Sequence, residues 1–262
     1  MKTNYVQEYH DDDIPVGRVL SRREVLALFG GAGAAAILSA CVPFGFGPGD
    51  EAPELSAIAT VNASLPTGCV VRPELTEGPL FVEEEELNRS DIRPDPSNGT
   101  VSEGAQLDLT FRVTELINGT CTPLAGVQVD VWHCDAFGIY SDTSELGMQT
   151  VGQKFLRGYQ ITDENGVASF TTIYPGWYEG RAVHIHFKMR TDAGYDFTSQ
   201  LFFDESLTDE VFAQAPYNTR GEGHLRNEDD GIFRQSGNQM MLAVNQVQSG
   251  YEASFDVALD LT

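Results

Sequence analysis

The stretch "AQLDLTFRVTEL" (residues 105–116) alternates apolar and polar side chains. An alternation with a period of two places the apolar side chains on one face of an extended chain, as in a half-buried β-strand. A turn-rich segment, "INGTCTPLAG" (117–126), separates it from a second alternating stretch, "VQVDVWHC" (127–134). Turn residues between two such runs predict a hairpin formed by these two strands.

The same texture continues along the chain. The stretches "FLRGYQIT" (155–162) and "VASFTTIY" (167–174) flank the acidic turn "DENG" (163–166), which predicts a second hairpin. Further strands are expected in "VHIHFKMRT" (183–191), "TSQLFFD" (198–204) and "YEASFDVALDLT" (251–262), and a short helix in "LTDEVFAQ" (207–214). We therefore expect an all-β fold, an antiparallel β-sandwich with long active-site loops and little helix.

Composition limits the classes of partner. The 262 residues are 41% hydrophobic and 10% aromatic, which is typical of a globular protein with a sizeable core. Lys and Arg number 16 against 39 Asp and Glu, for a formal net charge of −23 at pH 7. Because this charge repels a phosphate backbone, we expect no nucleic-acid partner.

The first residues carry the pattern of an export signal. Arg22 and Arg23 precede an apolar run rich in Ala and Gly that ends in "LSAC" at Cys41. The run is short for a membrane span and lacks the amphipathic spacing of a core helix. It predicts a twin-arginine-type lipoprotein signal over residues 1–41, with Cys41 acylated. The protein is then exported and lipid-anchored at the cell surface or the periplasmic face of a bacterial membrane.

The segment after the predicted signal indicates a tether. Residues 42–67 are rich in Gly, Pro, Ala and Ser without a sustained period, which predicts a flexible linker ahead of one domain over 68–262. Export implies an oxidising compartment, where Cys69, Cys121 and Cys134 allow one intramolecular disulfide and leave one thiol. The sequence leaves the pairing open.

Two histidines stand one residue apart in "RAVHIH" (181–186). On a strand, His184 and His186 point to the same face, while Ile185 and Phe187 point to the other, apolar one. This geometry can place two imidazole nitrogens on one ion, and imidazole suits Zn, Cu, Fe and Ni alike. A pair of surface or hydrogen-bonded histidines is the alternative interpretation.

Several linked motifs, in the same order, resemble the intradiol ring-cleaving dioxygenases. They are "PELTEGPLF" (73–81), "VDVWHCDAFGIYS" (129–141), "FLRGYQITDENG" (155–166), "TIYPGWYEGRAVHIH" (172–186) and "TSQLFF" (198–203). The resemblance covers most of residues 68–262 and implies that this is a catalytic domain. Residues 42–72 are too short and too rich in Gly and Pro for the helical dimerisation region of catechol 1,2-dioxygenases, so the likeness is to exported single-domain members.

The resemblance implies a set of site residues. Family members hold a non-haem ferric ion, Fe(III), with two tyrosinates and two histidines, and these positions fall on Tyr140, Tyr178, His184 and His186. Arg181, ahead of the ligand strand, is implied to stabilise a developing anion, with Gln200 as its polar neighbour. Tyr178 is implied to be the tyrosinate that the substrate displaces and that acts as a base.

The implied activity is cleavage of a catechol-type ring between its two hydroxyl-bearing carbons with O2, giving a cis,cis-muconate-type diacid. Catechol, protocatechuate and larger lignin-derived catechols stay open as substrates, and so does the oligomeric state. The alternative is a non-catalytic transthyretin-like β-sandwich that binds or spaces at the cell surface. We expect Trp132, His133, Tyr159 and Trp177 in the core or pocket wall, and His224 in a solvated loop, "GEGHLRNEDD" (221–230).

Overall fold

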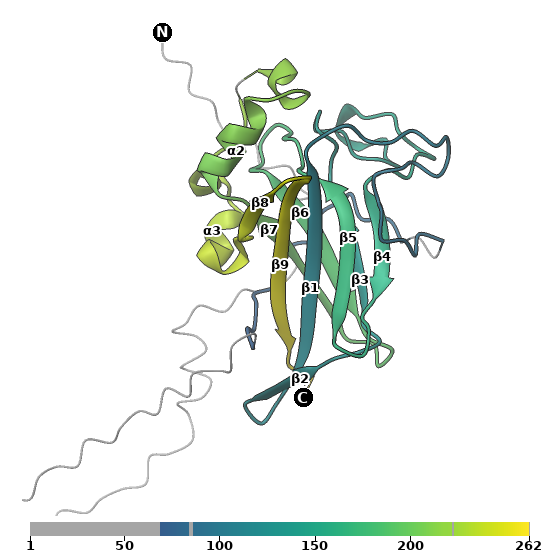
Figure 1. Ribbon diagram of the computed structural model, residues 1–262, viewed down its shortest axis with the longest axis vertical. Coiled ribbons are helices and arrows are strands. Elements are labelled where there is room, and N and C mark those ends of the chain that lie inside the picture. The colour runs from purple at the N-terminus through teal and green to yellow at the C-terminus, as the bar shows by residue number, and fades with distance from the viewer. Residues whose placement is uncertain (1–68, 84–85, 222, 262) are drawn as a thin grey trace, which may run out of the picture. The chain divides into compact units, whose positions relative to one another are not determined.

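The computed structural model describes residues 69–83, 86–221 and 223–261. The predicted signal with Cys41 and the predicted tether lie outside these residues. Within them, most of the regular structure is strand, arranged in two β-sheets (Figure 1). The prediction of an all-β sandwich with little helix is confirmed.

Each sheet has its own set of strands. Sheet A contains β1 (Gln106–Ile117), β2 (Thr120–Pro123), β5 (Val167–Ile173), β8 (Val244–Val247) and β9 (Gly250–Leu259). Sheet B has the order β4-β3-β6-β7, from β3 (Gln128–Trp132), β4 (Arg157–Ile161), β6 (His184–Arg190) and β7 (Asp196–Phe202). Each strand predicted from the alternation pattern is present in one of the two sheets.

Both predicted hairpins are wrong. The strand β1 pairs with β2 and β5 in sheet A, whereas β3 pairs with β4 and β6 in sheet B. The acidic turn does reverse the chain, because the N–H of Gly166 donates to the carbonyl of Asp163 at 2.9 Å. It nevertheless carries the chain from β4 in sheet B to β5 in sheet A. Alternation decides which face of a strand is buried and leaves its partner undetermined.

One pairing departs from the antiparallel expectation. The strands β1 and β9 run parallel, in register from Leu107 opposite Tyr251 to Glu115 opposite Leu259. The other pairings between named strands are antiparallel. A parallel pair needs a long connection, and here the connection from β1 to β9 contains all of sheet B.

Aromatic side chains join the two sheets. The ring centroid of Phe187 in β6 lies 5.1 Å from that of Phe111 in β1 and 5.9 Å from that of Phe255 in β9. All three side chains are buried, and each contributes roughly 1.5–3 kcal/mol through the apolar surface it removes from water. Because Phe187 faces sheet A, the alternate residues of β6, His184 and His186, face away from it.

An N-terminal segment crosses the outer face of sheet B. The N–H of Leu75 donates to the carbonyl of Thr198 in β7 at 3.0 Å, and the hydroxyl of Ser199 donates to the carbonyl of Pro73 at 2.9 Å. This segment begins at the disulfide between Cys69 and Cys121. The third cysteine, Cys134, is a buried free thiol. Further along, the Thr76 carbonyl accepts from Gln200, which lies opposite His186, and Glu77 accepts from Lys188 of β6 at 2.9 Å, so this part of the segment covers the face of β6 that carries the two histidines.

The helices are short and lie beside β7 and β8 (Figure 1). They are α2 (Glu205–Phe212) and α3 (Phe233–Ser236), with 3-10 turns η2 (Glu145–Gly147), η3 (Tyr217–Arg220), η4 (Asn227–Asp229) and η5 (Gly237–Met240). The carboxylate of Asp204 caps α2 by accepting the N–H groups of Ser206 and Leu207, which confirms the predicted helix. No helix in the described part of the chain is long and apolar enough to cross a bilayer.

Candidate active site

The two histidines of β6 meet at their Nε2 atoms, which lie 3.0 Å apart. Both side chains are 2% exposed. His184 Nδ1 lies 2.7 Å from the carbonyl oxygen of Ala182, which can only accept, so Nδ1 carries the proton and Nε2 presents a lone pair. His186 is held differently, since the indole of Trp132 stacks on its ring with centroids 4.9 Å apart and planes inclined by 10°.

Two tyrosines approach the histidine pair from separate loops. The fully buried Tyr140 follows β3, and its hydroxyl oxygen lies 3.5 Å from His184 Nε2. Tyr178 comes from the loop between β5 and β6 and is half-buried. Its ring centroid lies 5.7 Å from that of His184 and 5.6 Å from that of Tyr140. Two phenols and two imidazoles therefore surround one point on the outer face of sheet B.

Burial shifts the titration of these groups in opposite directions. Burial lowers the pKa of His184 to about 3, and the charge of Arg181 acts in the same direction. Burial, together with the neighbouring His184, holds the pKa of His186 well below its ordinary value. Burial raises the pKa of the Tyr140 phenol far above its usual range, and Tyr178 adds to this shift. At neutral pH both imidazoles are uncharged, so each has a nitrogen lone pair that can bind a metal. Tyr140 ionises only where a cation compensates the charge of its phenolate.

These donors fit a hard, highly charged metal ion. Among the described residues, no group of three or more His, Cys, Asp and Glu side chains is placed to hold a metal. The phenols of Tyr140 and Tyr178, which lie beside His184, can supply oxygen ligands to a metal bound there. Phenolate oxygen is an anionic ligand that suits Fe(III), and neutral imidazole completes such a set.

Arg181 contacts two other residues of the predicted site, Gln200 and Tyr178. Arg181 is 6% exposed, and its guanidinium donates from Nη2 to Gln200 Oε1 at 2.6 Å. The nitrogen Nη1 lies 3.5 Å from the hydroxyl of Tyr178. Gln200 in turn donates from Nε2 to the carbonyl of Thr76 at 2.9 Å, on the segment that covers β6. The structure thus brings together all six residues that the sequence singled out, Tyr140, Tyr178, Arg181, His184, His186 and Gln200, and their roles stay predictions.

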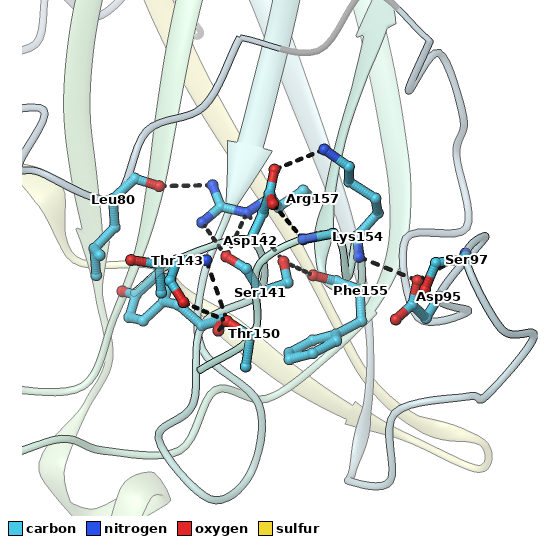
Figure 2. Close-up of polar contacts among 12 residues, drawn as sticks. Leu80, Asp95, Ser97, Ser141, Asp142, Thr143, Thr150, Lys154, Phe155 and Arg157 are labelled. Carbon is cyan, nitrogen blue, oxygen red and sulfur yellow. Dashed lines mark hydrogen bonds and ion pairs between the residues drawn. The ribbon is translucent and has the colours of Figure 1, made fainter. Parts of the chain in front are cut away.

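A buried arginine holds the loop of Tyr140 (Figure 2). Arg157, which is 3% exposed, donates from Nη2 to the carbonyl of Ser141 at 2.7 Å and from Nε to the Ser141 hydroxyl at 3.0 Å. Its Nη1 donates to the carbonyl of Leu80 at 2.6 Å. The hydroxyl of Thr150 donates to the carbonyl of Tyr140 at 2.6 Å. The backbone just after the Tyr140 side chain is therefore fixed by hydrogen bonds from β4 and the 140–156 loop.

The sequence does not mark Arg157 as a supporting residue. It stands within the motif at 155–166, and nothing in its local pattern shows that it is buried. An arginine at a strand end is ordinarily exposed, and its burial here depends on carbonyls that other segments supply. The only available signal was its position within a motif that also resembles the family.

Asp230 is a second residue that the sequence did not single out. Its carboxylate is fully buried and accepts from Arg181 Nε at 3.0 Å. Asn227 is also buried, and His224 is half-buried against Phe212, with ring centroids 5.1 Å apart. The prediction that residues 221–230 form a solvated loop is therefore wrong at Asn227 and Asp230. Composition marked the run as polar, but it could not show which acidic residue meets a buried arginine.

The four residues that were expected in the core or the pocket wall are buried or half-buried. Trp132 and His133 are buried, and Tyr159 and Trp177 are half-buried. His133 Nε2 lies 2.7 Å from the hydroxyl of Thr172, and Nδ1 lies 2.8 Å from its neighbour's carbonyl oxygen. Burial lowers the pKa of His133 to about 4. This histidine is therefore a neutral core residue that hydrogen-bonds across to β5.

Comparison with known proteins gives a family and several relatives. The model of a family described as dioxygenase matches residues 76–261. A solved intradiol ring-cleavage dioxygenase from Tetranychus urticae is 31% identical with a TM-score of 0.66, over 73% of this chain and 95% of that chain. The dioxygenase domain of a dioxygenase and carbohydrate-binding protein fusion from Streptomyces sp. SirexAA-E is 27% identical with a TM-score of 0.54, over 74% and 100%.

Longer relatives match only in part. The catechol 1,2-dioxygenase of Candida albicans is 30% identical over 158 residues, which are 52% of this chain and 47% of that protein. This chain spans about half the length of the curated relatives it matches. The likeness to these proteins therefore concerns a shared region, whereas the two solved relatives are covered almost throughout.

Proposed function

Because this chain belongs to the intradiol ring-cleavage dioxygenase family, we propose that it opens the ring of a catechol-type aromatic with O2. The bond that breaks joins the two hydroxyl-bearing carbons, and the product is a cis,cis-muconate-type diacid carrying both oxygen atoms. The observation that carries the proposal is the meeting of His184 Nε2 and His186 Nε2 at 3.0 Å, with the buried Tyr140 hydroxyl at 3.5 Å.

In this proposal Tyr140, Tyr178, His184 and His186 hold one ferric ion. When bound, the ion supplies the redox chemistry that joins O2 to the aromatic ring. The low pKa of both histidines leaves each imidazole neutral, with one lone pair, at neutral pH, and the hydrogen bond from Nδ1 to Ala182 places that lone pair on Nε2 of His184. Two phenolates reduce the net charge of the buried site, which an ion held by imidazoles alone would leave high.

Tyr140 and Tyr178 have different roles in this proposal because their solvent exposure differs. A catechol must lose both hydroxyl protons to bind through two oxygens. A phenolate is a base strong enough to take one of them, and hydroxide from the solvent can take the other. Tyr178 is half-buried, whereas Tyr140 is fully buried and its backbone carbonyl is held by Thr150. Tyr178 is therefore the tyrosine that leaves its place and receives a proton at its oxygen, and Tyr140 stays.

Arg181 acts as a fixed positive charge beside the reacting atoms. Its Nη1 lies 3.5 Å from the Tyr178 hydroxyl, where a displaced phenolate or a developing substrate anion would lie. A guanidinium stays protonated at neutral pH, and it offers no lone pair to a metal. Gln200 accepts from Nη2 of Arg181 and so holds the planar group in one orientation.

The cellular location is proposed from the sequence of residues 1–41, which lie outside the described residues. The paired Arg22 and Arg23 and the run ending at Cys41 support export by a twin-arginine route and acylation of Cys41. The lipid is then the only membrane contact of the protein. The aromatic substrate is met outside the cytoplasm.

The experiment is spectroscopic and chemical together. Iron-loaded protein should be red-brown from tyrosinate-to-iron charge transfer, and catechol added without O2 should shift this band. With ¹⁸O2, mass spectrometry should find both labelled atoms in a ring-opened diacid. A protein that stays colourless and iron-free after reconstitution would favour a non-catalytic transthyretin-like sandwich module.

A further inference from the structure

We propose that Asp230 is a positioning residue that orients the Arg181 guanidinium toward Tyr178. The inference rests on the function proposed above for Arg181. It concerns a residue that is not one of the predicted metal ligands and that acts through its contact with Arg181.

The carboxylate of Asp230 is anchored by backbone. Its Oδ1 accepts from the N–H of Ile232 at 2.7 Å and of Phe233 at 3.1 Å, and its Oδ2 accepts from the N–H of Ala182 at 2.8 Å. The side chain has no exposed surface. Three main-chain N–H groups therefore hold both carboxylate oxygens of Asp230 in place, independently of any side-chain donor.

The fourth donor is the guanidinium itself. Arg181 Nε donates to Asp230 Oδ2 at 3.0 Å, in an ion pair whose side chains are 7% and 0% exposed. Because Nε lies at the inner edge of the planar guanidinium, holding it against a fixed oxygen sets the direction of Nη1 and Nη2. Those two nitrogens reach Tyr178 and Gln200, respectively.

The four groups that donate to the Asp230 carboxylate are all N–H groups, which makes the residue type specific. A carboxylate has acceptor positions for four donors, whereas an asparagine must turn its own NH2 group toward two of them. An Asp-to-Asn change keeps the volume and removes the charge while creating a donor-to-donor conflict in a buried place. We expect the guanidinium to be the group that yields, because the other three donors are main-chain atoms.

The loop that carries Asp230 is itself docked. Asn227, on the η4 turn, donates from Nδ2 to the carbonyl of Phe203 at 2.8 Å, and its N–H donates to Glu205 Oε1 at 2.6 Å. These contacts tie the loop to the end of β7 and the start of α2. The anchor for Arg181 thus comes from a segment far along the chain that is rigidly attached to sheet B.

The test is a double-mutant cycle on the iron-loaded protein. Asp230→Asn should keep the iron content and the dissociation constant for catechol, from the anaerobic band shift, near wild type. Its turnover number should fall about 10–100-fold, less than the about 10²–10³-fold expected for removing the charged donor in Arg181→Gln. Added to Arg181→Gln, the Asp230→Asn change should lower turnover by less than about threefold, since a residue acting through Arg181 has nothing left to orient.

Controls separate positioning from loss of fold. Asp229→Asn removes the same charge from the exposed neighbouring residue and should leave turnover unchanged. Asp230→Glu keeps all four acceptor positions but moves them by one methylene, and it should also lower turnover with iron retained. If Asp230→Asn does not fold, the Asp230→Glu variant provides the test of the inference.

The outcomes are distinguishable. Full turnover in Asp230→Asn, multiplicative losses in the double mutant, or iron loss in both Asp230 variants would overturn the positioning role while leaving the proposed function intact. Full turnover in Arg181→Gln would instead overturn the role proposed for Arg181. An absence of ring cleavage in iron-loaded wild type would overturn the proposed function.

Discussion

His184 Nε2 lies 3.0 Å from His186 Nε2 at the buried outer face of β6. Two neutral imidazoles reach this separation only by sharing a proton or a cation, because two facing lone pairs repel. His184 already donates its Nδ1 proton to Ala182, so its Nε2 can only accept or coordinate. A cation between the two Nε2 atoms would remove this repulsion.

Removing either imidazole should prevent the proposed site from holding iron. His184→Ala or His186→Ala should lower iron content and abolish the charge-transfer band and turnover, because each removes one of four proposed ligands. The loss of affinity should exceed the about 10–100-fold caused by mutating a supporting residue near a metal. Metal analysis after reconstitution measures this. His224→Ala, which lies against Phe212 away from the pair, should bind iron like wild type, and full iron occupancy in a His184 variant would reject the ligand assignment.

Arg181→Gln should separate binding from chemistry. The variant should keep its colour and iron, and catechol should still shift the band, because a guanidinium does not ligate metal. Turnover should fall by about 10²–10³, the size seen when one preorganised donor to a developing anion is removed. Arg181→Lys should recover only part of the loss, since a point charge lacks the planar fork. Loss of iron in Arg181→Gln would show that the residue is structural.

Thr150→Val should weaken the support of Tyr140. The change keeps the shape and leaves the Tyr140 carbonyl without its 2.6 Å donor in a buried place. We expect the free energy of unfolding to fall by about 1–3 kcal/mol. Urea denaturation measures it, with Thr110→Val as the control, because the Thr110 hydroxyl bonds Ser169 on an exposed surface. Equal effects in the two variants would argue against a special role for Thr150.

His133 should make the fold sensitive to acid. Its folded pKa of about 4 lies below the ordinary value of 6.5, so the unfolded chain takes up a proton first as pH falls. The contribution of neutral His133 to the free energy of unfolding is therefore full above pH 6.5 and is lost as the pH falls from 6.5 to about 4. Below about pH 4 this residue causes no further change. The loss is roughly 3 kcal/mol.

The comparison variant is His133→Gln. It should be less stable at pH 7, because it loses hydrogen bonds to Thr172 and Cys134, but its stability should fall less than that of wild type between pH 7 and pH 4.5. Urea midpoints of both proteins at the two pH values, in the same metal state, measure the difference. Parallel losses in the two proteins would mean that His133 is not the titrating group.

Cys41→Ser should release the protein from membranes. If Cys41 carries the lipid, fractionation of the producing bacterium should find wild type with the membranes and the variant in the soluble extract. Ring-cleaving activity per mole of iron should be equal in both, because the change lies far outside the catalytic domain. Wild type that is wholly unacylated by mass spectrometry would end this proposal.

Local patterns in the sequence were enough to predict the faces of the strands and to name candidate residues for the site. In β6 the alternation predicted that Ile185 and Phe187 enter the core while His184 and His186 share the other face, and both outcomes follow from the geometry of an extended chain. The tyrosines, Arg181 and Gln200 came from motifs that resemble a family. These are local properties, and short stretches of sequence contain them.

Tertiary structure alone decided which distant groups meet. Both predicted hairpins failed because alternation does not encode a strand's partner, and the pairing of Cys69 with Cys121 was equally open. Arg157 and Asp230 are ordinary charged residues in sequence. Each is buried only because segments far along the chain supply complementary partners, carbonyl oxygens for Arg157 and N–H groups and a guanidinium for Asp230. A buried charge is tolerated where such partners surround it, and they are assembled only when the two sheets and their loops pack together.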